Sequence, residues 1–152
     1  MDNITNTAPS NLSSKVKRDF ITIPKPNNMF NVPCSSALDF FKWWCIFLRP
    51  FIDLTDREVE VIASLLKQRW ELSKRISDVG VLDAMTMSDD IKKAVIQECG
   101  ITSQHFYVVK SALKKKGVII NDRIHSRLIP DVKEDDNGMF ILLIQFKENV
   151  RQ

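Results

Sequence analysis

Basic and hydrogen-bonding side chains recur at helical spacing between positions 103 and 127, and they are the groups best suited to contact a ligand. No acid interrupts residues 103–116, which hold four lysines. When a helix lies in the major groove of DNA, glutamine can read adenine, and lysine can read guanine or a phosphate. The alternative is a solvated helix end, because Asp122, Asp131 and an acidic loop at 134–136 would repel phosphates. The candidate DNA-binding residues are Ser103, Gln104, Tyr107, Lys110, Lys114, Arg123 and Arg127.

The chain offers no recognisable catalytic or metal-binding set. His105 and His125 are its only histidines, and a general base needs a nearby nucleophile or an orienting acid. Its three cysteines are scattered, without the paired spacing of a zinc site or a disulfide framework. Four glycines are too few to indicate a phosphate-binding loop. We therefore expect no enzymatic activity, no metal, no cofactor and no small-molecule substrate.

The elements that would present residues 103–116 form a helix, a tight turn and a second helix. Gly100 follows a helical pattern and suits a left-handed backbone just past a helix end. Thr102 is placed to cap the next helix through its hydroxyl. Ile101 and Phe106 have the spacing of a hydrophobic staple. Gly117 ends the second helix, and an apolar strand follows. This order predicts a helix-turn-helix with the start of a wing.

The same domain is expected to begin with a well-capped helix. Thr55 and Glu58 form a capping box, and Leu54 with Val59 adds a staple. We expect a domain over residues 51–152 that is mainly α with a small antiparallel sheet (α+β), in the form of a winged helix-turn-helix. The further elements predicted are a helix reaching about Lys74, a short element at 79–85, a helix capped by Ser88, and strands at 118–120, 124–129 and 139–146.

Two segments precede this domain. Residues 1–33 are polar and proline-containing without a helical period, which predicts an extended arm. Residues 34–50 predict an aromatic helix that is apolar on two sides and must be buried on both. Burial against its own domain and the arm is one interpretation, and contact with another subunit is the other, since aromatics are enriched at interface cores. The candidate partner-binding residues are Phe20, Ile21, Ile23, Met29 and Phe30 in the arm and Phe40, Trp43, Trp44 and Phe47 in the helix.

Charge and hydropathy narrow the class of partner. The net charge of +3 gives little electrostatic attraction to nucleic acid. The run FFKWWCIFL is too short to span a bilayer, and residues 1–30 lack the apolar core of a signal peptide. Unpaired cysteines are typical of a reducing, intracellular origin. We therefore expect a protein that does not act at a membrane.

Several blocks resemble a family of small proteins in crAss-like phages, which are short-tailed viruses of gut Bacteroidetes. The blocks are FIDLTDREVEVIASLLKQRWELSKRIS, MSDDIKKAVIQECGITSQHFYVVKSALKKKGVI and RLIP, and the resemblance covers about residues 36–147. The arm has no clear match. The LT-x-x-E helix start and the LKKKGVI ending are also similar to those of winged-helix regulators in general.

The phage resemblance implies a virion component. Such virions contain rings of small proteins between portal and tail, so we expect a structural protein, a ring or adaptor subunit at the portal–tail junction. Its partners would be other virion proteins, including copies of itself in a ring. The alternative is a winged-helix DNA-binding transcriptional regulator in the cytoplasm of the host. The first hypothesis assigns function to the arm and the aromatic helix, and the second assigns it to residues 103–127.

Overall fold

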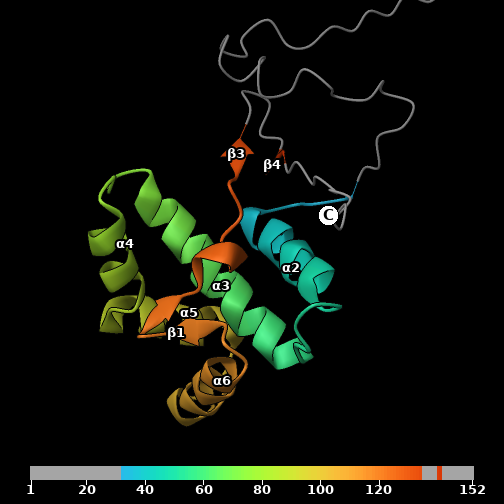
Figure 1. Cartoon of the computed structure of the whole chain (residues 1–152), viewed down its shortest axis with the longest axis vertical. Helices are drawn as coiled ribbons and strands as arrows, with labels where there is room; N and C mark the ends of the chain where they lie inside the picture. The colour runs from blue at the N-terminus through green and yellow to red at the C-terminus, as the bar shows by residue number, and fades with distance from the viewer. Residues whose placement is uncertain (1–31, 135–139, 142–152) are drawn as a thin grey trace, which may run out of the picture. The chain divides into compact units, whose positions relative to one another are not determined.

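The computed structural model describes residues 32–134 and 140–141 (Figure 1). The arm residues Phe20, Ile21, Ile23, Met29 and Phe30 lie outside this part of the chain. A boundary falls between Pro33 and Cys34, so the aromatic helix belongs to the same unit as the domain that follows it. The helices are α2 (Ala37–Leu48), α3 (Asp56–Ser73), α4 (Val79–Thr86), α5 (Asp89–Cys99), α6 (Ser103–Lys115) and the short 3-10 helix η2 (Ser126–Leu128). The strands are β1 (Ile119–Ile120), β2 (Arg123–Ile124), β3 (Lys133–Glu134) and β4 (Phe140–Ile141).

Helix α3 is the centre of the domain, and α2, α4, α5 and α6 all pack against it (Figure 1). Its first turn has the predicted capping box: the Glu58 N–H donates to the Thr55 hydroxyl, and the Thr55 N–H donates to the Glu58 carboxylate at 2.9 Å. Both staple residues, Leu54 and Val59, are buried. Leu65, in the middle of α3, is also fully buried. A helix covered on so many sides holds the others in place.

The hydrophobic core contains side chains from helices that are far apart in the sequence. Phe41 and Cys45 on α2 meet α3 from one side, while Phe106 and Leu113 on α6 approach it from another. Burial of large apolar side chains contributes about 1.5–3 kcal/mol each. The fully covered members of this core include Phe41, Val61, Ile62, Leu65, Leu66, Val95, Phe106, Leu113, Val118 and Ile119.

The turn between α5 and α6 has the predicted geometry. Gly100 is left-handed, with a φ of 61°, and the Thr102 hydroxyl accepts from the His105 N–H at 3.1 Å. Ile101 is half-buried, and Phe106 is fully buried. The predicted cap of α5 is different, because Ser88 occupies the cap position without a side-chain hydrogen bond.

The first two strands are shorter than predicted, and most of the strand predicted over 139–146 lies outside the described residues. β1 and β2 form an antiparallel hairpin whose turn residues, Asn121 and Asp122, have φ angles of 52° and 56°. Two such residues match the turn that suits the twist of a hairpin. The expected strand over 124–129 is wrong beyond Ile124: His125 Nδ1 accepts from the Arg127 N–H at 3.1 Å and begins η2. β3 and β4 pair in a separate two-stranded antiparallel sheet. The described chain is thus mainly helical with small antiparallel sheets.

Candidate interaction surfaces

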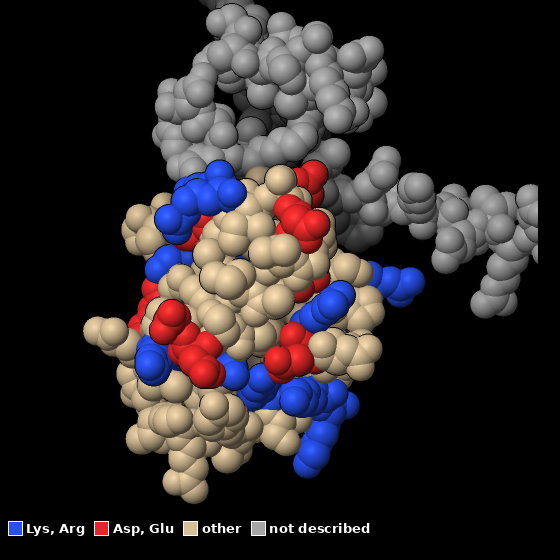
Figure 2. All heavy atoms as spheres, turned by 90° about the vertical axis from the view of Figure 1, so that its left-hand side faces the viewer, with Lys and Arg blue, Asp and Glu red and all other residues tan. Residues whose placement is uncertain are grey.

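The outer side of α6 is a shallow groove with little charge. Its volume is about 540 Å³, and Tyr107 and Val108 are its exposed apolar members. In Figure 2 the lower left of the molecule is uncharged, and lysine and arginine side chains gather to its right. This surface can bury apolar groups and form a few hydrogen bonds. The groove is lined by Gln104, Tyr107, Val108, Ser111, Ala112 and Lys115.

The prediction that Lys110 faces outward is wrong. Its side chain is only 8% exposed, and its ammonium group forms an ion pair with Asp122 at 2.6 Å. The hydrogen bond from Lys110 lowers the pKa of Asp122, against the effect of burial, and the charges of Lys110, Lys114 and Lys92 lower it further. Lys110 therefore ties α6 to the turn of the β1–β2 hairpin, and its side chain is largely covered where a contact with DNA would need it exposed.

Lys116, just after α6, is also used within the fold. Its ammonium group donates to the Asp53 carbonyl oxygen and pairs with Glu58 at 2.7 Å. Burial alone would raise the pKa of Glu58, but the hydrogen bonds from Lys116 and from the Thr55 N–H, with the Lys116 charge, lower it below its usual value. Glu58 thus joins the first turn of α3 to the last turn of α6.

The remaining predicted DNA-binding residues are exposed. Ser103, Gln104 and Tyr107 lie at the start of α6. Among the residues that the structure describes, no ion pair involves four of the exposed cations of this region. These cations are Lys114, Lys115, Arg123 and Arg127.

On α2, the structure separates the predicted partner-binding aromatics into two groups. Phe40 packs against the core and meets Phe41 edge-on, with ring centroids 5.2 Å apart. The indole N–H of Trp44 donates to the Leu128 carbonyl oxygen at 2.8 Å. Beside them, burial raises the pKa of the Cys45 thiol to about 12. Phe40 and Trp44 therefore hold α2 to its own domain.

The second group is exposed and contiguous. Trp43, Ile46, Phe47 and Phe51 retain between 39% and 75% of their surface, and we refer to these four residues as the α2 apolar surface. The rings of Phe47 and Phe51 lie 6.3 Å apart. Sequence reasoning missed Ile46 and Phe51, although Phe51 follows Phe47 at a one-turn interval that continues the aromatic pattern past Pro50.

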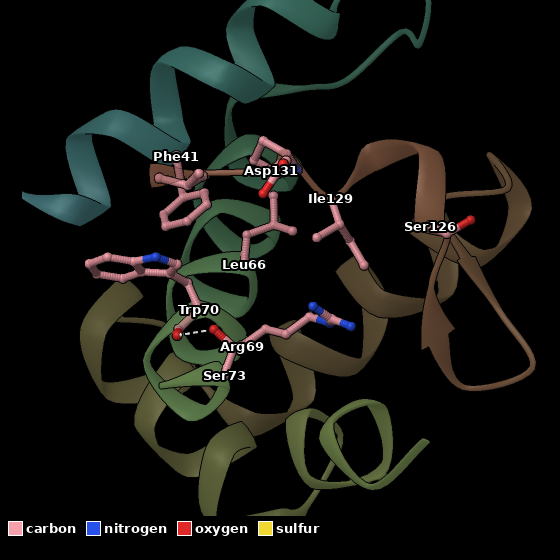
Figure 3. A pocket seen from close by; sticks show the side chains of 10 residues that line it. Phe41, Leu66, Arg69, Trp70, Ser73, Ser126, Ile129 and Asp131 are labelled. Atoms are coloured by element: carbon pink, nitrogen blue, oxygen red, sulfur yellow. Dashed lines mark hydrogen bonds between the residues drawn. The ribbon is translucent and has the colours of Figure 1, made fainter. Parts of the chain in front are cut away.

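A cavity of about 370 Å³ opens between α2, α3 and the segment after η2 (Figure 3). Phe41, Leu66 and Trp70 line it from the helices, and Ile129 lies across from them. Its one cation, Arg69, donates two hydrogen bonds to Asp83, at 3.1 and 2.8 Å. The charge of Arg69 is therefore already balanced, and the other polar residues that line the cavity are Ser73, Ser126 and Asp131.

Over residues 32–134 and 140–141, no group of three or more His, Cys, Asp or Glu side chains could hold a metal ion. Within the same residues, no helix is long and apolar enough to cross a membrane. Comparison of the chain with protein-family models, with curated proteins and with solved structures gives no match.

Proposed function

We propose that this chain is a non-enzymatic assembly protein of a tailed-phage virion, a ring or adaptor subunit at the portal–tail junction. The observation that carries the proposal is the α2 apolar surface, which groups exposed aromatic side chains on one helix and the turn after it. The arm at residues 1–33 would make the remaining partner contacts. The assignment to a phage particle rests on the resemblance of residues 36–147 to crAss-like phage proteins.

The α2 apolar surface has the chemistry of a protein interface. Single exposed apolar residues are ordinary, but contiguous aromatic groups mark contact sites, and aromatics are enriched at interface cores. Phe51 is 75% exposed, so covering it alone would contribute roughly 1–2 kcal/mol. Nothing about this surface favours DNA, since its four members carry no charge.

The arm suits the same role. Its apolar residues are spaced through a polar, proline-containing segment, as in chains that order on binding. Ordering costs free energy at that step, but lets a short segment cover a large area of a neighbour. In this proposal Phe20, Ile21, Ile23, Met29 and Phe30 are the apolar groups that the partner buries.

The test is reconstitution of the full chain with the portal and tail proteins of the same phage, followed by sedimentation velocity. We expect a complex that Phe51→Ser together with Ile46→Ser weakens, and that removal of residues 1–31 abolishes. Ile120→Ser is the matched control, because Ile120 is a similarly exposed apolar residue on β1. A chain that stays monomeric with every structural protein of the particle would contradict the proposal.

A specific observation favours DNA binding as the second candidate. Lys114, Lys115, Arg123 and Arg127 are exposed and unpaired in the described chain, and the first two lie in the last turn of a helix that follows a three-residue turn. In this candidate function α5, α6 and the β1–β2 hairpin act as a winged helix-turn-helix. Anisotropy with a labelled mixed-sequence DNA pool, at low and physiological salt, tests it. Submicromolar binding at physiological salt, weakened by Lys114→Ala, would support a regulator, and its absence would leave the assembly function.

A further inference from the structure

Helix α4 carries an apolar surface distinct from that of α2. Its buried side is formed by Leu82 and Thr86, while Val81, Ala84 and Met85 are exposed. Val81 and Met85 are one helical turn apart, so their side chains are neighbours. Figure 2 faces this side of the molecule and shows an uncharged area with charged side chains around it. We call Val81, Ala84 and Met85 the α4 surface.

The groove on α6 has the complementary character. Val108 is 61% exposed and lies one turn from Gln104 and from Ser111–Ala112, so the groove has an apolar centre with polar sides. Lys115 lies at one end of the groove. If Val81 and Met85 of another copy entered this groove, they would contact apolar groups at the centre of the groove and polar groups at its sides.

The charges carried by the α4 segment and by the α6 segment themselves are opposite in sign. Residues 77–90, which include α4, contain four aspartates and no lysine or arginine, whereas residues 103–116, which include α6, contain four lysines and no acid. Part of each set is balanced within the fold. Asp83 pairs with Arg69, Asp89 with Lys92, Lys110 with Asp122, and Lys116 with Glu58. The charges that remain are Asp78 and Asp90 beside α4, and Lys114 and Lys115 on α6.

We propose that the α4 surface of one copy docks in the α6 groove of a second copy. Both halves of a complementary pair belong to the same chain, which makes the contact head-to-tail and allows each subunit to bind two neighbours. Opposite charges at the edge of an apolar contact select its orientation more than they strengthen it. This contact is separate from the α2 apolar surface and the arm, to which the proposed function assigns other virion partners.

Two variants of the full chain separate this arrangement from a symmetric dimer. Val81→Asp places a charge on the α4 surface, and Val108→Glu places one in the α6 groove; both positions are more than half exposed, so the fold should persist. Sedimentation velocity of the wild type should show association that increases with concentration. Each variant alone should associate about tenfold or more weakly, since its new carboxylate would be desolvated without a partner. Unfolding curves check that both variants remain folded.

The decisive sample is an equimolar mixture of the two variants. The intact α6 groove of Val81→Asp can still receive the intact α4 surface of Val108→Glu, so the mixture should form a 1:1 dimer and stop there. Ile120→Glu, a charge at another exposed apolar position, should associate like the wild type. Phe51→Ser should also retain self-association, which keeps this test distinct from that of the α2 apolar surface.

Three results would overturn the proposal. The first is a wild type that remains monomeric at every concentration. The second is undiminished association of Val81→Asp or Val108→Glu alone, which would indicate a symmetric contact through the other surface. The third is a Val108→Glu variant that loses binding to DNA or to a different virion protein while its self-association is unchanged.

Discussion

Replacing Lys116 by methionine would remove the charge that balances Glu58 while keeping the aliphatic stem. Glu58 is 5% exposed, and its Oε2 receives the Lys116 ammonium group at 2.7 Å and the Thr55 N–H at 2.9 Å. In the variant the Thr55 N–H would be the remaining donor of the two. Lys116 has a right-handed backbone, with a φ of −84°, so methionine fits the position without strain.

The cost follows from the uncompensated carboxylate. Hydrogen bonds to charged groups contribute about 1.5–3 kcal/mol, and removing one partner of a fully buried pair costs about 3–5 kcal/mol. Lys116 is 29% exposed at its side chain, so water can reach the vacated position and the lower range applies. We expect Lys116→Met to lower the free energy of unfolding by about 2–3 kcal/mol. Glu58→Gln, which keeps an acceptor for Thr55, should cost about 1 kcal/mol.

The double variant decides whether the buried charge is the cause. Adding Glu58→Gln to Lys116→Met removes the unpaired charge and should recover about 1 kcal/mol relative to Lys116→Met alone. Urea unfolding followed by tryptophan fluorescence measures all four proteins, with an unchanged m-value as the condition for comparison. If the two single effects simply added, Glu58 and Lys116 would not be coupled, and the reasoning from burial would be refuted.

The dependence on pH gives an independent check of the same pair. The pKa of Glu58 in the folded protein is lowered from 4.5, so the unfolded chain binds the proton more tightly. Its contribution to stability is therefore complete above pH 4.5 and is lost as the pH falls through the folded value. In Lys116→Met, burial is opposed mainly by the hydrogen bonds of Thr55, so the pKa of Glu58 should lie higher than in the wild type. The stability of that variant should fall less than that of the wild type on acidification from pH 6 to pH 4.

Other substitutions test single contacts by the same unfolding assay. Gly100→Ala should cost about 1 kcal/mol, since the backbone is left-handed there although the space around it is open. Trp44→Phe should cost about 1–2 kcal/mol, because the Leu128 carbonyl oxygen loses its donor while most of the ring packing remains. Lys110→Met should cost at most about 1 kcal/mol, because Asp122 is exposed and remains hydrated. A loss above about 2 kcal/mol for Lys110→Met would show that this pair is more buried than the structure indicates.

The features predicted correctly from sequence depend on residues close together in the chain. The capping box of Thr55 and Glu58 involves positions three residues apart, and the turn at Gly100 is determined by one residue without a Cβ. Short-range signals of this kind define helix ends with few alternatives. For that reason the order and approximate bounds of the α-helices could be predicted from sequence.

The features missed depend on contacts between distant segments. Helical spacing places Lys110 outward, but the hairpin turn returns Asp122 to within 2.6 Å of its ammonium group. Trp44 and Trp43 were both predicted to bind a partner, but the indole N–H of Trp44 donates to Leu128, 84 residues away in its own chain. No local pattern distinguishes a charged or aromatic side chain with such a partner from one without it, so the composition of the candidate surfaces required the structure.

The ion pairs that Lys110 and Lys116 form within the fold set a limit on DNA binding. Each phosphate neutralised contributes about 0.9 to the slope of log affinity against log salt concentration. Lys114, Lys115, Arg123 and Arg127 are the cations of residues 103–127 without an ion pair among the described residues, so binding through this region should have a slope no steeper than about −4. Anisotropy measured across a salt series determines that slope. A clearly steeper value would mean that Lys110 leaves Asp122 to reach a phosphate or that the arm binds DNA, and either result would weaken the assignment of α6 to contacts between subunits.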